Sequence, residues 1–178
     1  MTISLHRPVC ELLGCTYPLV LAGMGGVARS ELATAVAQAG GFGFLGMVRE
    51  PVELIRNEVQ AMRKNGVQRF GVNLIPAATP TALLDAQIQA CIELQVPVVA
   101  LFWDLSSEAV ARLRAAGIVV VCQVGSVAEA VAARRAGAQV IIAQGCEAGG
   151  HVRSGTPLGE ILPQVVAAVD CPVLAAGG

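Results

Sequence analysis

Short apolar runs alternate with longer segments of helical period along the whole chain. Seven runs rich in β-branched residues predict strands, at residues 18–22, 42–46, 69–74, 97–102, 118–122, 139–143 and 172–175. Six segments between them predict helices, at residues 30–39, 51–64, 80–94, 106–115, 126–136 and 157–169. The predicted strands are continuously apolar, which is typical of a sheet buried on both faces. The chain therefore predicts an α/β fold with a parallel sheet.

Residues that favour helix ends lie at the expected boundaries. Thr79 and Thr156 each precede a proline, so we expect them to act as N-caps. Ser126 and Glu129 have the spacing of a capping box. Helix-terminating glycines follow three of the segments, at Gly40, Gly117 and Gly137. These ends support a strict alternation of strand and helix without a linker.

Strict alternation fits either an open doubly wound sheet or a (β/α)8 barrel. The open sheet would place a GxGxxG phosphate loop after the first strand, whereas residues 22–26 read AGMGG. Seven nearly equivalent units favour the barrel, which needs about 250 residues in full. We therefore expect an incomplete (β/α)8 TIM barrel with about seven strands and six helices. Residues 1–178 would form the N-terminal and central part of one domain, as a fragment of a longer protein whose last helix, eighth strand and any lid segment lie outside it.

Composition and charge exclude several classes of protein. Hydrophobic residues make up 54% and charged residues 14% of the chain, so we expect a homo-oligomer interface or further chain to cover apolar surface. A net charge of −1 without a basic tract argues against nucleic-acid binding. The longest apolar stretch, residues 96–103, is too short for a membrane span of about 20 residues. The first residues do not resemble a signal peptide, so we expect a cytoplasmic protein.

Cysteine and histidine spacing gives no sign of a disulfide or a metal site. The six cysteines contain no CxxC pair, so we expect them to be reduced and buried. Cys146 lacks a second nearby histidine that would activate it, which favours a packing role. The two histidines, His6 and His151, are far apart and have no ligand pattern around them, so no metal site is predicted.

In barrels of this kind the active site lies at the C-terminal ends of the strands. Glycines and amides dominate these positions, which suits a planar polar cofactor with a phosphate tail. His151 is the strongest candidate for a general base, because it lies in the glycine-rich segment 144–151 and imidazole titrates near neutral pH. A solvent-exposed loop histidine is the alternative. Glu147 fits a solvated or helix-capping charge, and the glycine pair 177–178 fits a phosphate site or a plain turn.

Four segments resemble a known family. They are GCTYPLVLAGMGG at residues 14–26, GVNL at 71–74, QGCEAGGH at 144–151 and PVLAAGG at 172–178. Together they are similar to the nitronate monooxygenases, which are FMN-dependent (β/α)8-barrel enzymes, and to the related FMN-containing enoyl-acyl-carrier-protein reductases. QGCEAGGH is the most specific of the four, and the others support it by their order along the chain.

The resemblance implies which residues contact the flavin ring. Ala22, Gly23 and Met24 would line the isoalloxazine after the first strand. Asn73 would contact FMN after the third strand, and Gln123 would approach the ring after the fifth.

The resemblance also implies a site for the ribityl phosphate. Gln144, Gly149 and Gly150 would bind the flavin or its tail after the sixth strand. Gly177 and Gly178 would receive the phosphate, and a further phosphate segment of the family would lie beyond residue 178.

The implied activity is oxidation of a nitronate or nitroalkane by O2 to a carbonyl compound and nitrite, with His151 as the base for the α-proton. The chain departs from the family at Gly23, where proline is common, and at Phe102, Trp103 and Asp104, which are bulky and charged. Two alternatives remain open. One is an enoyl-acyl-carrier-protein reductase that uses NAD(P)H, and the other is a truncated, non-catalytic barrel.

Overall fold

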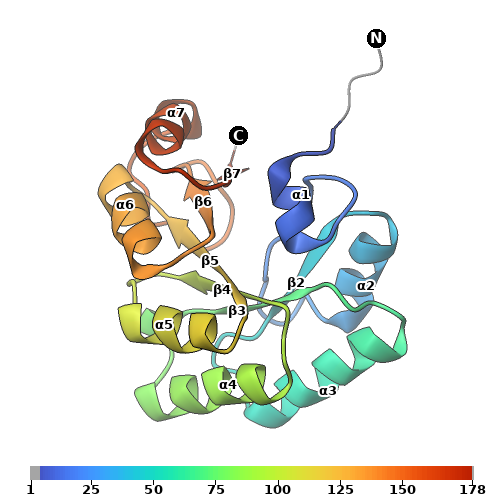
Figure 1. Ribbon diagram of the computed structural model, residues 1–178. Helices are drawn as coiled ribbons and strands as arrows, with labels where there is room; N and C mark the ends of the chain where they lie inside the picture. The colour runs from blue at the N-terminus through green and yellow to red at the C-terminus, as the bar shows by residue number, and fades with distance from the viewer. Residues whose placement is uncertain (1–4, 178) are drawn as a thin grey trace.

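The computed structural model describes residues 5–177. Seven parallel strands form one sheet whose spatial order follows the sequence, from β1 to β7 (Figure 1). Their bounds are β1 (Val20–Leu21), β2 (Phe42–Gly46), β3 (Gly71–Leu74), β4 (Val98–Phe102), β5 (Val119–Val124), β6 (Val140–Gln144) and β7 (Val173–Ala176). Helices cover the outer face of the curved sheet. The predicted partial barrel of parallel βα units is therefore confirmed.

Seven α-helices and one 3-10 helix occur in residues 5–177. They are α1 (Pro8–Leu13), α2 (Ser30–Gln38), α3 (Val52–Lys64), η1 (Pro76–Ala78), α4 (Thr81–Glu93), α5 (Ser107–Ala115), α6 (Val127–Ala136) and α7 (Leu158–Ala168). The six longer α-helices match the predicted segments within one residue at each end. The structure adds α1 and η1 to the six predicted helices, because these two are too short to show a helical period in the sequence.

The short helix α1 covers the N-terminal end of the barrel interior. Its apolar side chains are buried in an inner cluster with residues of β2, β4, β5 and β6. The helix begins with Pro8 and ends before Gly14, whose φ is 76°. Arg69 donates to the carbonyl oxygens of Leu12 at 2.6 Å and Leu13 at 3.1 Å. A side chain from the segment just before β3 therefore binds the last turn of α1.

The two faces of the sheet are buried in two clusters. Along β4, Val98 and Ala100 belong to the inner cluster, whereas Val99 and Leu101 pack in a larger cluster against the outer helices. Successive side chains of a strand point to opposite faces, so this division continues along the strand. Burial on both faces explains why the strands read as uninterrupted apolar runs.

Two of the predicted helix caps are wrong. Pro80 and Pro157 are the N-cap residues of α4 and α7, in place of Thr79 and Thr156. The hydroxyl of Thr79 instead donates to the carbonyl of Ile75 at 2.9 Å. Each helix thus begins one residue later than the Thr-Pro pair predicts.

The predicted capping box on α6 is confirmed in part. The Ser126 hydroxyl accepts from the backbone N–H of Glu129 at 3.2 Å. The Glu129 carboxylate accepts from the N–H of Gly125 at 2.7 Å, and not from that of Ser126. The predicted terminating glycines all have positive φ, at Gly40, Gly117 and Gly137.

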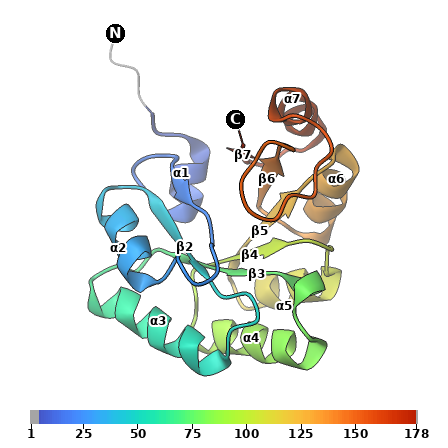
Figure 2. The same cartoon turned by 180° about the vertical axis from the view of Figure 1, so that it is seen from behind.

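The strands β1 and β7 are the two edges of the sheet, and they do not pair with each other in the described residues. A cavity of about 600 Å³ lies beside β7 and is also lined by Pro8 and Val9 of α1. Figures 1 and 2 show α1 and β7 next to each other, and both contribute residues to the lining of this cavity. Within residues 5–177, no helix is long and apolar enough to cross a membrane.

Candidate functional site

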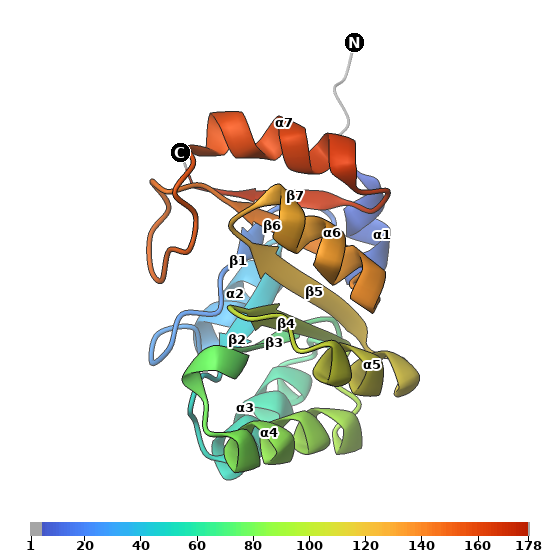
Figure 3. The same ribbon diagram turned by 90° about the vertical axis from the view of Figure 1, so that its left-hand side faces the viewer.

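The C-terminal ends of the strands lie on one side of the sheet, where the β1–α2 and β6–α7 loops extend beyond them (Figure 3). Three amide side chains occupy inward-facing positions at the ends of their strands. Asn73 pairs in register with Ala100, which faces the inner cluster. Gln123 and Gln144 each lie two residues after a side chain of the inner cluster, Val121 and Ile142 respectively. Strand alternation therefore turns all three amides toward the barrel interior. The predicted polar edge of the barrel is thus formed by β3, β5 and β6.

The β1–α2 loop crosses directly over the ends of β2 and β3. The Asn73 side-chain Nδ2 donates to the carbonyl of Gly23 at 3.2 Å. A Cβ added at Gly23 would lie 2.2 Å from the Cβ of Asn73. A Cβ at Gly46 would lie 2.3 Å from the carbonyl oxygen of Met24. The two glycines therefore allow this loop to approach the strand ends, and they bring Gly23 and Met24 close to Asn73.

Arg29 holds the same loop from its other side. Its Nη1 donates to the carbonyl of Gly46 at 3.1 Å, and its Nη2 pairs with Glu50 at 2.5 Å. The sequence analysis did not identify this pair, because the two residues are 21 positions apart and belong to no motif.

The β6–α7 loop is organised by the side chain of Gln144, which is 2% exposed. Its Nε2 donates to the carbonyl of His151 at 2.9 Å. Its Oε1 accepts from the backbone N–H of Arg153 at 3.3 Å. One buried amide therefore binds the chain on both sides of residue 152 and fixes the backbone that carries His151.

His151 is exposed to solvent, and its ring lies against that of Trp103. The ring centroids are 5.1 Å apart and the planes are at 75°, an edge-to-face arrangement. Trp103 and Asp104 have φ values of 55° and 50°, which are unusual for residues other than glycine. Strained backbone of this kind occurs often at functional sites. The departure from the family pattern at residues 102–104 thus contacts the predicted base.

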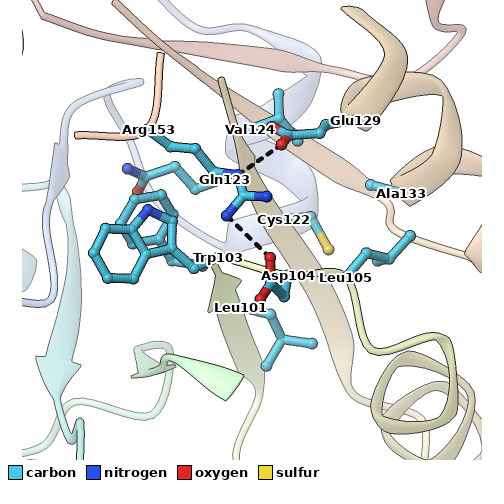
Figure 4. Close-up of a pocket in the computed structure, with 11 residues that line it drawn as sticks. Leu101, Trp103, Asp104, Leu105, Cys122, Gln123, Val124, Glu129, Ala133 and Arg153 are labelled. Atoms are coloured by element: carbon cyan, nitrogen blue, oxygen red, sulfur yellow. Dashed lines mark hydrogen bonds and ion pairs between the residues drawn. The ribbon is translucent and has the colours of Figure 1, made fainter. Parts of the chain in front are cut away.

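Arg153 connects the β6–α7 loop to two other segments. Its Nε lies 2.7 Å from Oε1 of Glu129 on α6, and its Nη1 lies 3.0 Å from Oδ1 of Asp104 (Figure 4). These residues border a cavity of about 300 Å³ between the ends of β4 and β5, with Cys122 and Ala133 among its apolar lining. No local pattern in the sequence identifies Arg153, because only the fold brings its two acidic partners to it.

Glu147 has the helix-capping role that the sequence offered as one interpretation. Its carboxylate accepts from the N–H of Leu158 at 2.9 Å, at the start of α7. Hydrogen bonds from the backbone N–H groups of Glu147 and Leu158 hold the pKa of this carboxyl below its usual value. The Glu147 carboxylate therefore caps the N-terminus of α7, which leaves it poorly placed to act as an acid or base.

The cysteines differ in exposure. All six are free, and three are buried, at Cys10, Cys91 and Cys122. Burial raises the pKa of both Cys91 and Cys122 to about 12, which makes them unreactive. Cys146 is exposed, so its predicted packing role is wrong. No group of three or more metal-ligating side chains occurs in residues 5–177.

The glycines predicted to receive the cofactor tail lie in open or strained positions. Gly149 and Gly150 have no atom within 4 Å of an added Cβ, and Gly150 has a φ of 79°. Gly177 has a φ of 125° and lies beside Ala148 of the β6–α7 loop, 3.5 Å from an added Cβ. The end of β7 and this loop therefore meet. Gly178, the other predicted phosphate ligand, lies outside the described residues.

The residues at this edge fit the expected cofactor, FMN. Asn73 and Gln144 each retain an amide hydrogen beyond the bond they make, and the side chain of Gln123 makes no hydrogen bond among the described residues. Space is open at Gly25 and Gly26 of the β1–α2 loop and at Gly149 and Gly150 of the β6–α7 loop. Neutral donors and exposed glycine backbone suit a flat heterocycle and a phosphate, whereas a carboxylate-rich edge would suit a divalent cation.

Comparisons with known proteins agree with this geometry. The nitronate monooxygenase family profile matches residues 6–86 and 78–178. The chain is 34% identical over 176 residues to the (3aS,4S,5R,7aS)-5-hydroxy-7a-methyl-1-oxo-octahydro-1H-indene-4-carboxyl-CoA dehydrogenase of Rhodococcus jostii (strain RHA1), which covers 98% of this chain and 48% of that protein. It is 29% identical over 212 residues to a probable nitronate monooxygenase of Staphylococcus aureus (strain Newman), which covers 94% and 59%.

Solved structures show the same relationship. FabK from Thermotoga maritima superposes with a TM-score of 0.89 at 30% identity, over 96% of this chain and 53% of FabK. Nitroalkane oxidase from Streptomyces ansochromogenes superposes with a TM-score of 0.83 at 31% identity, over 94% and 59%. The chain thus spans about half the length of the relatives that it matches. FMN is the cofactor of the family these comparisons indicate. With its partial barrel and its QGCEAGGH loop at the strand ends, the chain belongs to the nitronate monooxygenase family.

Proposed function

We propose that this chain carries the base and most of the cofactor site of an FMN-dependent oxidoreductase that oxidises nitronates or nitroalkanes. Its substrates are a small nitro compound and O2, and its products are a carbonyl compound and nitrite. The observation that carries the proposal is the position of His151, which is exposed at the strand ends on a backbone fixed by Gln144. The expected cytoplasmic location and homo-oligomer remain predictions.

Two sets of residues would hold FMN. The ring would lie against residues 22–24, Asn73 and Gln123, and the phosphate tail would approach Gln144 and the glycines at positions 149, 150, 177 and 178. When bound, FMN would supply the electron transfer between the substrate and O2. The chain itself supplies neutral hydrogen-bond donors and a loop that glycine allows to approach closely.

His151 would remove the α-proton of a neutral nitroalkane and so form the nitronate. An exposed imidazole can take up a proton near neutral pH and release it to solvent. The contact with Trp103 at 5.1 Å limits the rotation of the ring, and the bond from Gln144 limits the movement of the backbone. A fixed base reacts faster because its orientation is set before the substrate binds.

The test compares His151→Ala with His6→Ala, since His6 is the second histidine and is exposed far from the strand ends. The His151 variant should keep the flavin absorption spectrum and lose turnover of neutral nitroalkanes, while it keeps more activity on preformed nitronates. The His6 variant should match the wild type. Unchanged nitroalkane turnover in the His151 variant would remove this residue from the mechanism. Purified protein without flavin would favour the non-catalytic alternative.

A second candidate function is oxidoreduction of an acyl thioester. Two similarities favour it: the TM-score of 0.89 to FabK and the 34% identity to the indene-carboxyl-CoA dehydrogenase of Rhodococcus jostii. Anaerobic mixing separates the candidates. Rapid bleaching of the flavin by NAD(P)H would favour the thioester reductase, and bleaching by an alkyl nitronate alone would favour nitronate oxidation.

A further inference from the structure

Arg153 is a charged side chain that connects its own β6–α7 loop to the segment after β4 and to α6, around the predicted base. Its guanidinium lies 2.7 Å from Glu129 at the start of α6 and 3.0 Å from Asp104 after β4 (Figure 4). The side chains of Arg153, Asp104 and Glu129 are 39%, 64% and 34% exposed. Ion pairs with this exposure add little to stability. We call Arg153, Asp104 and Glu129 the Arg153 bridge. Because it adds little to stability, its main effect is expected on the positions of the segments that carry His151 and Trp103.

One side of the Arg153 bridge leads to the backbone of His151. The N–H of Arg153 donates to Gln144, whose amide donates in turn to the carbonyl of His151. The next residue, Ser154, packs so closely on the β5–α6 turn that a Cβ at Gly125 would lie 2.8 Å from its nitrogen. Residues 151–154 are therefore fixed to Gln144 below them and to the start of α6 beside them.

The other side of the Arg153 bridge leads to Trp103. Asp104 follows Trp103 directly, and both residues have the strained φ values of 55° and 50°. The indole Nε1 is buried and has no hydrogen-bond partner among the described residues. No hydrogen bond of its own side chain orients Trp103, so its ring position depends on this backbone turn and on its contacts with Phe102 and His151.

We infer that Arg153 is a positioning residue that sets the contact between the rings of His151 and Trp103. The guanidinium has N–H groups directed to both acidic partners, and so it can hold the strained turn of Trp103 and the loop of His151 in one arrangement. A lysine at this position would keep the charge but would present a single ammonium group. The catalytic consequence rests on the proposed role of His151 as base, whereas the geometric consequence does not.

The fluorescence of Trp103 reports the geometry directly, because it is the only tryptophan in the 178 residues. A protonated imidazole in contact with an excited indole quenches it by accepting an electron. Wild-type protein should therefore show a step down in emission when the solution is acidified. This step should disappear in His151→Gln. A wild-type signal without a His151-dependent step would overturn the inference, because the ring contact would then be absent.

Arg153→Met should lose at least half of the His151-dependent step, and Arg153→Lys should recover only part of it. Asp104→Ala should give the same loss from the other side of the Arg153 bridge, which keeps the test valid if one variant folds poorly by circular dichroism. The matched control is Arg112→Met, which breaks the similarly exposed pair of Arg112 with Asp85 on the outer helices. A full step in folded Arg153→Met and Asp104→Ala would overturn the inference.

Kinetics separate this inference from the proposed function. If His151 is the base, Arg153→Met should lower kcat for a neutral nitroalkane by roughly 10- to 100-fold with little change in KM, since a misplaced base slows the chemical step. Turnover of a preformed nitronate should fall much less. A fluorescence change without any nitroalkane activity in the wild type would support the positioning role and reject the proposed function. Unchanged fluorescence with unchanged kcat would reject the positioning role alone.

Discussion

Gly46→Ala should displace the β1–α2 loop and lower both stability and FMN affinity. The new Cβ would lie 2.3 Å from the carbonyl oxygen and 2.4 Å from the carbonyl carbon of Met24. Ordinary contact begins at 3.4 Å, so the loop must move by about 1.1 Å. These are backbone atoms, which cannot rotate away as a side chain would. Arg29 further restricts the movement, because it donates to the carbonyl of Gly46 at 3.1 Å.

The expected cost is that of overpacking a well-filled site, about 1–3 kcal/mol. In a domain of this size each 1 kcal/mol shifts Tm by about 2–4 °C, so Tm should fall by about 2–12 °C. Gly159→Ala is the matched control, because Gly159 lies in α7 with no atom within 4 Å of an added Cβ. Alanine should raise helix stability there by up to about 1 kcal/mol.

The assay is thermal unfolding of both variants, followed by titration with FMN monitored by flavin fluorescence. Gly46→Ala should bind FMN more weakly, because the displaced segment contains Gly23 and Met24, which are proposed to contact the ring. A Gly46→Ala protein with wild-type Tm and wild-type FMN affinity would refute the close packing of this loop on the end of β2.

Two further predictions follow from Glu147 and from the cysteines. Glu147→Ala should lower Tm at neutral pH, because it removes the acceptor for the N–H of Leu158. Hydrogen bonds lower the pKa of Glu147 in the folded state. The stabilisation by this carboxylate is therefore present above the unfolded pKa and is lost as the pH falls through the folded pKa. Thermal scans should show wild type and variant converging in acid, and a constant difference would contradict this. Exposed Cys146 should react with a chromogenic disulfide reagent in a fast phase, and Cys146→Ser should remove this phase. Burial raises the pKa of Cys91 and Cys122 to about 12, so these two thiols should react only when the protein unfolds.

The longer elements could be predicted because each carries its own local signal. A helix of nine or more residues shows a 3.6-residue period, and a strand buried on both faces shows an uninterrupted apolar run. Helix α1 has no such signal, because it has only six residues. These residues are helical because they pack on the inner cluster and because Arg69 donates to the carbonyls of the last turn. The sequence-based prediction also misassigned Thr79 and Thr156, since an N-cap depends on backbone angles that the Thr-Pro pair alone does not determine.

The candidate site was predictable only in its outline. Because parallel strands end on the same side of a sheet, the residues that follow them must gather there, and this principle located Asn73, Gln144 and His151. It did not reveal that Gln144 binds the backbone of the His151 loop, or that Cys146 is exposed. Those features depend on the path of the β6–α7 loop, which is set by contacts with α6, α7 and β7.

The alternation of strand and helix, the parallel sheet and the side of the barrel that holds the candidate site could all be predicted from the sequence, because they follow from periodicity and strand direction. Which side chains surround the predicted base depends on the tertiary structure. Trp103, Asp104, Glu129 and Arg153 come from three segments that share no motif, and their contacts exist only when β4, β5 and β6 lie side by side. Long-range pairs of this kind are invisible to local reasoning, because their energies depend on distance in space and not on separation in the chain.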